Sequence, residues 1–190
     1  MFQSSRCCDS ISKKENALVV FLGDYVDRGP DSIKTLEVLI EAKKENPEWI
    51  FLRGNHDQML LDLIQGKSKP NIVFKVLNGL SSNEETTKVF FKWQNSSEQL
   101  KNEIGLFLES TQLFYETEHC IFIHAPLKNS TIPLDKKSNE ELMWNYDLTP
   151  NWEGKQFIHG HATVRKPVTT NKGHKYPLWL WWSIIRHAHC

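Results

Sequence analysis

The stretch ALVVFLGDYVDRG (residues 17–29) decides the first part of the fold, because an apolar run ends there in glycine, two acids and an arginine. The run Ala17–Asp24 is short and almost wholly apolar, which is typical of a strand buried on both faces in a parallel sheet. Asp24, Asp27 and Arg28 follow it, and the neighbouring glycines free the backbone at the strand end. The stretch therefore predicts a buried strand with a polar cluster at its carboxyl end.

A second strand and helix follow in the same order. Pro30 and Asp31 open a helix whose apolar residues fall at helical spacing, and KKENPE closes it. WIFLRGN (Trp49–Asn55) is a second buried strand, and the apolar residues of the next helix begin at Met59. This order predicts a βαβ unit with a right-handed crossover.

The remainder of the chain is less regular. Residues from about 67 to 110 are polar and weakly helical, and they predict a helical cap or insertion. TQLFYET and CIFIHA (within 111–125) predict a hairpin, ELMW (141–144) a short helix or strand, and QFIHGHATV (156–164) a further strand. Together these segments predict a single α/β domain over residues 1–190.

Composition excludes several classes of protein. Lysine plus arginine and aspartate plus glutamate both number 23, so the formal net charge is zero and we expect no nucleic-acid partner. No stretch approaches the roughly 20 apolar residues of a membrane span, and the first residues lack the apolar core of a signal peptide. The four cysteines form neither a disulfide framework nor a Cys-x-x-Cys zinc pair, which indicates free thiols. We expect a monomeric, cytoplasmic protein without a membrane partner.

Polar side chains follow four of the predicted strands. Each motif alone has an ordinary structural explanation, as a glycine–aspartate turn, a helix cap, a core histidine or a loop. Because loops at the carboxyl ends of α/β strands converge, four such motifs at consecutive strand ends favour one shared site. The clusters are Asp24, Asp27 and Arg28; Asn55, His56 and Asp57; His124; and His159 and His161.

Four of these residues suit a metal site. Asp24 can bridge two divalent cations with its two carboxylate oxygens, Asn55 offers an amide oxygen, and His124 and His161 offer imidazole nitrogens. This set favours manganese, with iron or zinc as alternatives, over calcium. Thiolates are absent from the set, which argues against a structural zinc site.

The remaining residues of these clusters suit phosphate chemistry. Arg28 can clamp phosphate oxygens bidentately. Asp27 can accept a ring N–H from His56, which raises the pKa of the imidazole and favours a proton donor. Metals, a clamping arginine and a charged histidine together predict phosphate ester hydrolysis.

In this order, the motifs GDYVDRG, LRGNHD, FIHA and IHGHA resemble those of the calcineurin-like metallophosphoesterases. The similarity covers roughly residues 19–168. The most similar branch is that of the phosphoprotein (serine/threonine) phosphatases and their bacterial relatives, which include diadenosine tetraphosphatase-like enzymes. Asp57 stands where the eukaryotic enzymes usually carry glutamate, and in this the chain resembles the bacterial members. The resemblance implies a four-layer α/β/β/α sandwich with two mixed sheets and two metals at the sheet edge.

The same resemblance implies a role for each site residue. Arg28 would bind the phosphoryl group together with Asn55, and His56, backed by Asp27, would act as general acid. Water activated by the metals would attack phosphorus in line, without a phosphoenzyme intermediate. Asp24 would bridge the metals, and the ligands of the second one would be Asp24, Asn55, His124 and His161.

The chain departs from the family pattern near its start. The family carries an Asp-x-His motif on a first strand ahead of GDYVDRG, whereas the first histidine of this chain is His56. We therefore expect a chain truncated at the N-terminus, without the first strand, and with one of the two metal sites incomplete. In LMWNYD, Tyr146 stands where bacterial members often show an arginine, so a second phosphate clamp is expected to be lost.

The tail from about residue 174 is also atypical, because the family expects a glycine-rich turn where this chain reads HKYPLWLWWSIIRHAHC. One hypothesis is that the last segment, about 17 residues, is translated out of frame, which sequencing of the coding DNA would test. The alternative is an aromatic patch that packs or binds a partner.

Three functions are open on the sequence alone. The leading one is a manganese-dependent phosphoprotein (serine/threonine) phosphatase, with activity impaired by the missing Asp-x-His motif. The second is a dinucleoside polyphosphate (diadenosine tetraphosphate) hydrolase, in which Trp93 or phenylalanines of the cap would stack on a base. The third is an inactive truncated fragment or a phosphate-binding pseudoenzyme.

Overall fold

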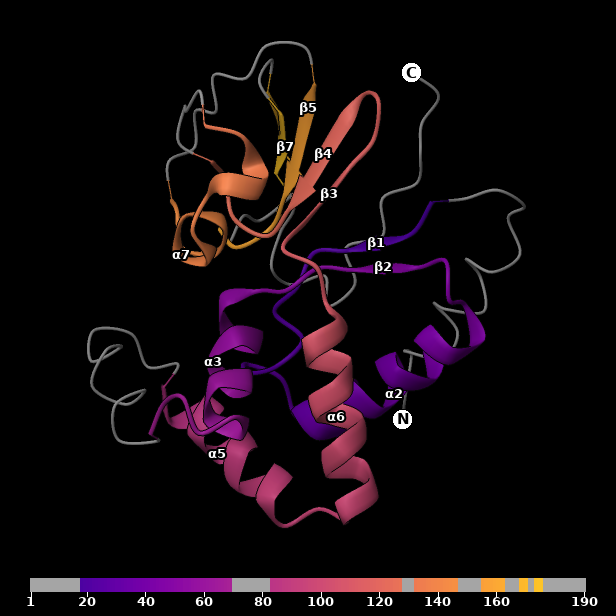
Figure 1. Cartoon of the computed structure of the whole chain (residues 1–190), viewed down its shortest axis with the longest axis vertical. Helices are drawn as coiled ribbons and strands as arrows, with labels where there is room; N and C mark the ends of the chain where they lie inside the picture. The colour runs from indigo at the N-terminus through magenta and orange to yellow at the C-terminus, as the bar shows by residue number, and fades with distance from the viewer. Residues whose placement is uncertain are drawn as a thin grey trace.

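The computed structural model of the chain describes residues 18–69, 83–127, 132–146, 155–162, 168–170 and 173–175. Within these ranges it shows a mixed α/β fold with two sheets and helices outside both (Figure 1). The expected missing first strand and most of the atypical tail concern residues 1–17 and 176–190, which lie outside the described residues. No helix in the described ranges is long and apolar enough to cross a membrane.

The βαβ unit predicted from the sequence is confirmed. Strands β1 (Val20–Phe21) and β2 (Ile50–Phe51) pair in parallel, with Val20 opposite Ile50 and Phe21 opposite Phe51. Helix α2 (Ser32–Glu45) connects them and is capped by Asp31, whose side chain accepts the Lys34 N–H at 3.2 Å. Because the two strands run in the same direction, the loops after both open on the same edge of the sheet.

Three further helices pack beside α2. They are α3 (Asn55–Ile64), α5 (Asn83–Gln94) and α6 (Glu98–Ser110), and α5 and α6 both contact α2 and α3. Within the segment 67–110, which the sequence predicts to be helical, Asn83–Gln94 and Glu98–Ser110 are helices. Phe90 and Phe107 of these helices are buried in the same core as Leu36 and Leu60. The role of the segment as a cap stays a prediction, as does the single-domain assignment.

The second sheet has the order β3–β4–β5–β7–β6. The predicted hairpin is confirmed, since β3 (Phe114–Glu116) and β4 (Cys120–Ile123) pair antiparallel. The β4 strand runs parallel to β5 (Gln156–His159), so its loop and the loop after β5 reach the same edge. The last two strands are β6 (Val168–Thr170) and β7 (Gly173–Lys175), which form an antiparallel pair.

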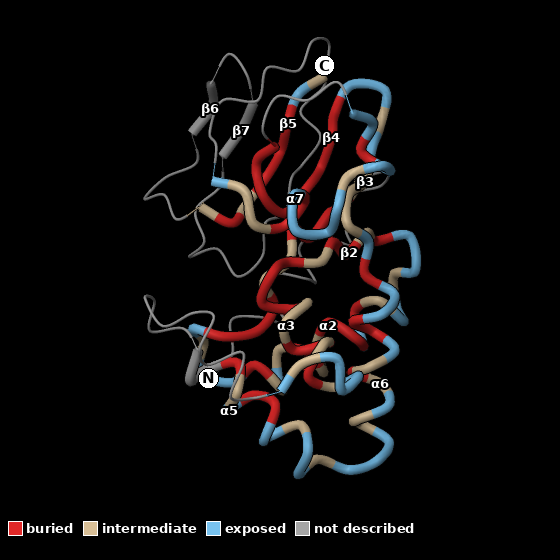
Figure 2. Tube along the Cα trace, turned by 60° about the vertical axis from the view of Figure 1, so that its left-hand side comes forward, coloured by how far each residue is buried: buried red, intermediate tan, exposed pale blue. Residues whose placement is uncertain are grey.

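Alternation along the strands produces four layers. Successive strand residues point to opposite faces, so each strand contributes to two different cores. Val19, Phe21 and Phe51 join the helix core, whereas Val20, Leu22 and Leu52 face the second sheet. On the second sheet, Phe122 and Ile158 face inward, and Ile121, Ile123 and Phe157 face the outer helical layer. Figure 2 shows buried positions along β4 and β5 and at the start of α3, which confirms an α/β/β/α arrangement.

The outer layer is formed by short helices. The 3-10 helix η1 (Leu134–Lys136) precedes α7 (Asn139–Met143), so the ELMW segment is helical. Ser138 caps α7, because its hydroxyl accepts the Glu141 N–H at 3.2 Å while the Glu141 carboxylate accepts the Ser138 N–H at 3.0 Å. Leu142 anchors this helix on the second sheet.

Candidate metal centre

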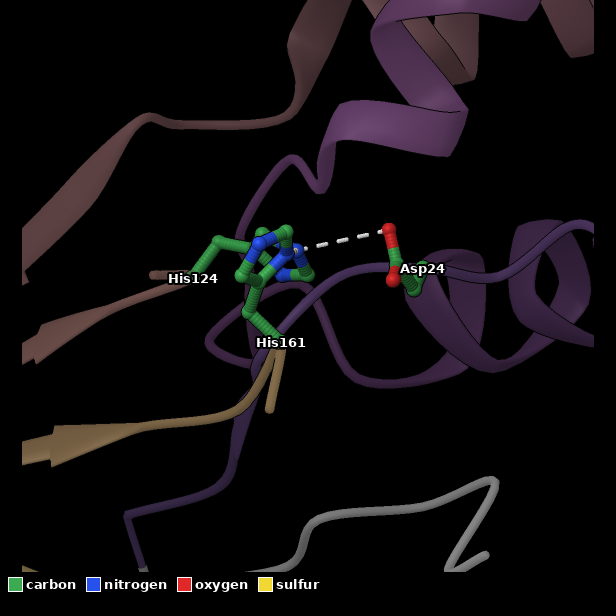
Figure 3. Close-up of side chains that lie close together, drawn as sticks. All are labelled: Asp24, His124 and His161. Atoms are coloured by element: carbon green, nitrogen blue, oxygen red, sulfur yellow. Dashed lines mark hydrogen bonds and ion pairs between the residues drawn. The ribbon is translucent and has the colours of Figure 1, made fainter. Parts of the chain in front are cut away.

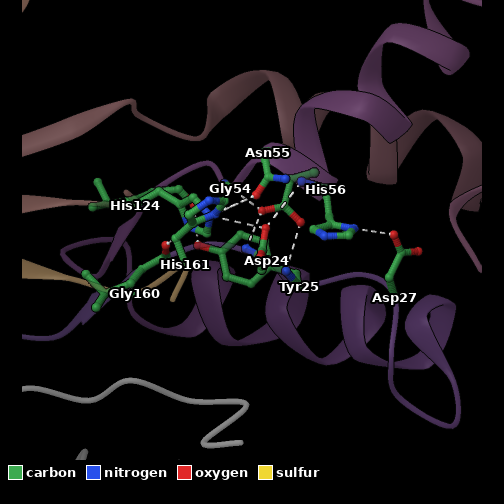
Figure 4. A network of polar contacts seen from close by, with 12 residues as sticks. Asp24, Tyr25, Asp27, Gly54, Asn55, His56, His124, Gly160 and His161 are labelled. Carbon is green, nitrogen blue, oxygen red and sulfur yellow. Dashed lines mark hydrogen bonds and ion pairs between the residues drawn. The ribbon is translucent and has the colours of Figure 1, made fainter. Parts of the chain in front are cut away.

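The polar clusters predicted at the strand ends converge at one place (Figure 4). Asp24 follows β1, Asn55 begins α3 directly after β2, His124 follows β4, and His161 follows β5. Both strand pairs, β1 with β2 and β4 with β5, are parallel, which brings all four loops to the same edge. His159, by contrast, is the last residue of β5, and its Nδ1 lies 3.2 Å from the Gly160 carbonyl oxygen.

The loop after β1 has an uncommon backbone conformation. Three non-glycine residues take positive φ there: Asp24 at 59°, Asp27 at 70° and Arg28 at 58°. Such left-handed residues are uncommon outside glycine and cluster at functional sites, where the surrounding structure holds them. His161, at 60°, is a fourth residue of this kind and belongs to the same site.

Two glycines allow this loop and the start of α3 to approach closely. A Cβ on Gly23 would lie 2.8 Å from the Arg53 carbonyl carbon, in addition to a closer clash with the Gly54 nitrogen. A Cβ on Gly54 would lie 2.9 Å from His124 Cε1 and would overlap the Asp24 carboxylate. Gly23 of GDYVDRG and Gly54 of RGNHD are therefore required by space at the centre.

Asp57 ties the same two segments together. Its Oδ2 accepts the backbone N–H of Asp24 at 2.7 Å and of Gly54 at 2.8 Å, and its Oδ1 accepts that of Tyr25 at 2.8 Å. Burial and the nearby Asp24 charge raise the pKa of Asp57 to about 7, against the opposing effect of these hydrogen bonds. The sequence predicted no role for Asp57 in the site. In the structure, its carboxylate holds the backbone from which the Asp24 side chain projects.

Four lone-pair atoms meet at the centre of the site. His124 Nε2 lies 3.0 Å from Asn55 Oδ1, 3.2 Å from His161 Nδ1 and 3.4 Å from Asp24 Oδ1. The His161 Nδ1 to Asn55 Oδ1 distance is 3.1 Å. Figure 3 shows the two imidazoles and the carboxylate directed at one another, and their ligand atoms lie within 4.8 Å.

The protonation of the two histidines fits a bound cation. His124 Nδ1 lies 2.7 Å from the Leu22 carbonyl oxygen, to which it donates, and this fixes Nε2 as a lone pair facing the centre. Burial lowers the pKa of His161 to about 3, so this imidazole is neutral at neutral pH. The pKa of Asp24 is lowered on balance, against the opposing effect of burial.

These donors therefore fit a divalent cation. A carboxylate, an amide oxygen and two imidazoles directed at one point can present lone pairs to a cation, and mixed oxygen and nitrogen sets suit Mn, Fe or Zn. The ring of His161 also has a buried Nε2 for which the described part of the chain offers no hydrogen-bond partner. The predicted ligands Asp24, Asn55, His124 and His161 are thus brought together in one set.

Beside this set lies a histidine–carboxylate pair. His56 Nδ1 is 2.5 Å from Asp27 Oδ2, and both side chains are buried. Burial by itself would lower the pKa of His56, but the Asp27 hydrogen bond and the charges of Asp24 and Asp27 raise it. Arg28 Nη2 lies 3.3 Å from His56 Nε2, so the predicted general acid and phosphate clamp are neighbours.

Thr86 belongs to this pair and was missed by sequence analysis. Its hydroxyl, which is fully buried on α5, donates to Asp27 Oδ2, the oxygen that also meets His56. Thr86 is 59 residues from Asp27 in a polar segment without a motif, so no sequence signal marks it.

The structure places two aromatic side chains at the edge of the centre. The Tyr146 ring centroid is 4.4 Å from that of His161, and the Trp144 centroid is 6.4 Å from it. Trp93, which sequence analysis suggested as a base-stacking residue, lies instead in the helix layer. Its ring stacks on Phe90 at 5.5 Å, and its Nε1 donates to the Lys101 carbonyl at 3.3 Å.

Comparison with known families agrees with this geometry. The family model described as calcineurin-like phosphoesterase matches residues 4–190. The chain belongs to the calcineurin-like phosphoesterase family. The fold class and family predicted from the four motifs are confirmed, and the family is one of divalent-metal hydrolases of phosphoric esters.

Curated relatives of this calcineurin-like phosphoesterase include three bacterial proteins named bis(5'-nucleosyl)-tetraphosphatase PrpE [asymmetrical]. The one from Oceanobacillus iheyensis is 26% identical over 178 residues, which cover 82% of this chain and 66% of the relative. Those from a Geobacillus strain and from Bacillus velezensis are 26% and 25% identical, over 80% and 83% of this chain. The chain spans about two thirds of the length of these relatives.

Proposed function

We propose that this chain is a metal-dependent phosphoric ester hydrolase whose cation is held by Asp24, Asn55, His124 and His161. The observation that carries the proposal is the convergence of their four lone-pair atoms, with 3.0–3.4 Å separating His124 Nε2 from the others. When bound, a divalent cation supplies Lewis-acid charge for the phosphoryl oxygens and lowers the pKa of water.

The chain's own residues bind the phosphoryl group and supply a proton. The Arg28 guanidinium can take phosphate oxygens bidentately next to the cation. His56 carries a raised pKa, so its imidazolium can protonate the departing oxygen, and Asp27 holds the ring by its Nδ1. Because Asp27 meets Nδ1, Nε2 is the His56 ring atom that would donate this proton.

Dinucleoside polyphosphates are the substrate class that we favour. The relatives named bis(5'-nucleosyl)-tetraphosphatase support this choice. Phosphoproteins are the second candidate, because GDYVDRG and RGNHD resemble the motifs of protein serine/threonine phosphatases. In both cases water adds to phosphorus and a P–O bond breaks, so the same residues serve either substrate.

The test is hydrolysis of diadenosine tetraphosphate with Mn²⁺, in parallel with a phosphoserine peptide. We expect formation of ATP and AMP that the His124→Ala variant abolishes and that His119→Ala leaves unchanged. His119 is a suitable control because it lies in the hairpin turn, with its side chain 54% exposed.

Two other results would change the assignment. Faster release of phosphate from the peptide than cleavage of the dinucleotide would move the assignment to the second candidate. Hydrolysis that survives in His124→Ala would contradict the assigned centre.

A further inference from the structure

The side of the centre next to His161 is formed by exposed aromatic surface. Tyr146 is 57% exposed, although its ring centroid lies only 4.4 Å from the His161 ring. Trp144 is half-buried, and its ring meets His161 edge-on at 77°. An exposed tyrosine ring therefore lies directly beside one of the proposed metal ligands.

These two aromatic residues are held in place by α7. Leu142 and Met143, the last residues of the helix, are each only 1% exposed, and Trp144 follows them directly. The Trp144 N–H donates to the Glu140 carbonyl at 2.9 Å, which closes the helix end. The aromatic pair is therefore carried by an anchored element.

A groove of about 350 Å³ continues from Trp144 along α7. Leu127 and Trp144 supply apolar lining, and Glu140, Glu141 and Lys137 supply charged lining. The Lys137 side chain is only 3% exposed and lies 3.8 Å from a Glu141 carboxylate oxygen. The groove thus combines aromatic surface with hydrogen-bond acceptors and carries no excess of positive charge.

We propose that the aromatic pair Trp144 and Tyr146, with the groove beside it, is a nucleoside subsite that positions the base of a nucleotide substrate. Stacking on Tyr146 suits any nucleobase. The carboxylates of Glu140 and Glu141 can accept hydrogen bonds from ribose hydroxyls and repel acidic peptides. This inference rests on the proposed function, because the adjacent centre is taken to hold the phosphates.

The test compares equilibrium binding of AMP, adenosine and ribose 5-phosphate by calorimetry, in the presence of Mn²⁺. Wild-type protein should bind AMP about tenfold more tightly than ribose 5-phosphate, a difference of about 1.4 kcal/mol. Tyr146→Ala should remove this preference and lower adenosine binding, with ribose 5-phosphate unchanged. Tyr146→Phe should keep the preference, because the ring remains.

Phe91→Ala is the matched control, since Phe91 is 50% exposed on α5, in the helix layer away from α7 (Figure 1). Equal affinity for AMP and ribose 5-phosphate in the wild type would overturn the inference. A preference that survives in Tyr146→Ala, or tighter binding of a basic phosphopeptide that depends on Tyr146, would overturn it too. Binding is measured without turnover, so a Tyr146-dependent preference in an inactive chain would support the subsite and contradict only the proposed hydrolysis.

Discussion

At the residue scale, the site depends on groups that hold the ligands in place. Asp24 has a positive φ, and the buried Asp57 carboxylate accepts its N–H together with those of Tyr25 and Gly54. His124 is oriented in the same way through the Leu22 carbonyl. Each supporting contact joins segments far apart in the sequence, so the ligand set exists only in the folded chain.

Asp57→Ala should destabilise the protein strongly. It leaves three N–H groups without their acceptor, and each unsatisfied buried group costs about 1–3 kcal/mol, so we expect a loss of roughly 3 kcal/mol or more. Asp57→Asn keeps one acceptor oxygen and should cost less. Urea denaturation measures both effects.

Asp135→Ala serves as the control, because the Asp135 side chain is 62% exposed and its ion pair with Lys136 lies on the surface. Its unfolding free energy should stay within about 0.5 kcal/mol of wild type. An Asp57→Ala protein as stable as this control would show that the three hydrogen bonds do not hold the loop.

At the element scale, helix α5 contributes to the centre through Thr86. The hydroxyl of Thr86 donates to Asp27, which in turn holds His56. The helix layer is thereby connected to the proposed proton donor. Thr86 touches neither substrate nor cation, so we regard it as a positioning residue.

Thr86→Val should lower turnover of alkyl phosphates roughly tenfold. A general acid typically accelerates a reaction by about 10²–10⁴-fold, and the loss of a residue that positions it should remove only part of this acceleration. Turnover of p-nitrophenyl phosphate should change little, because p-nitrophenolate leaves without protonation. Thr86→Ser keeps the hydroxyl and should behave as wild type, and His56→Asn should show the same selectivity more strongly. Equal losses on both substrates would indicate a structural role for Thr86 alone.

The sequence could predict the parts of the fold and of the site that belong to motifs. It could not predict residues that act through single tertiary contacts. The strands, the βαβ unit and the four ligands stand at apolar-to-polar transitions, which periodicity and motif spacing reveal. Thr86 acts through a tertiary contact to Asp27, 59 residues away, and no local pattern marks it. The sequence marks Tyr146 only as a departure from the family pattern, and its ring contact with His161, 15 residues away, appears only in the structure. The role of Asp57 depends on backbone N–H groups, which every residue except proline has.

At the scale of the whole molecule, the α/β/β/α packing brings an edge of the first sheet next to an edge of the second sheet. The ligands come from loops of two different sheets, Asp24 and Asn55 from the first, His124 and His161 from the second. A cation bound there connects the two halves of the sandwich. Binding to the folded chain alone therefore stabilises the whole fold.

Saturating Mn²⁺ should raise the melting temperature. At a concentration 100 times the dissociation constant the stabilisation is about 2.7 kcal/mol, which corresponds to roughly 5–10 °C for a chain of this size. EDTA should reverse the shift, and His161→Ala should not show it. A shift of the same size in His161→Ala would place the cation elsewhere.

The most direct test of the account is a calorimetric titration of the metal-free chain with Mn²⁺. We expect saturable binding of Mn²⁺, weakened roughly 100-fold or more in His124→Ala and His161→Ala and unchanged in His119→Ala. Unaltered affinity in the two ligand variants, or no saturable binding to the folded wild-type chain, would contradict the assignment of Asp24, Asn55, His124 and His161 as a metal centre.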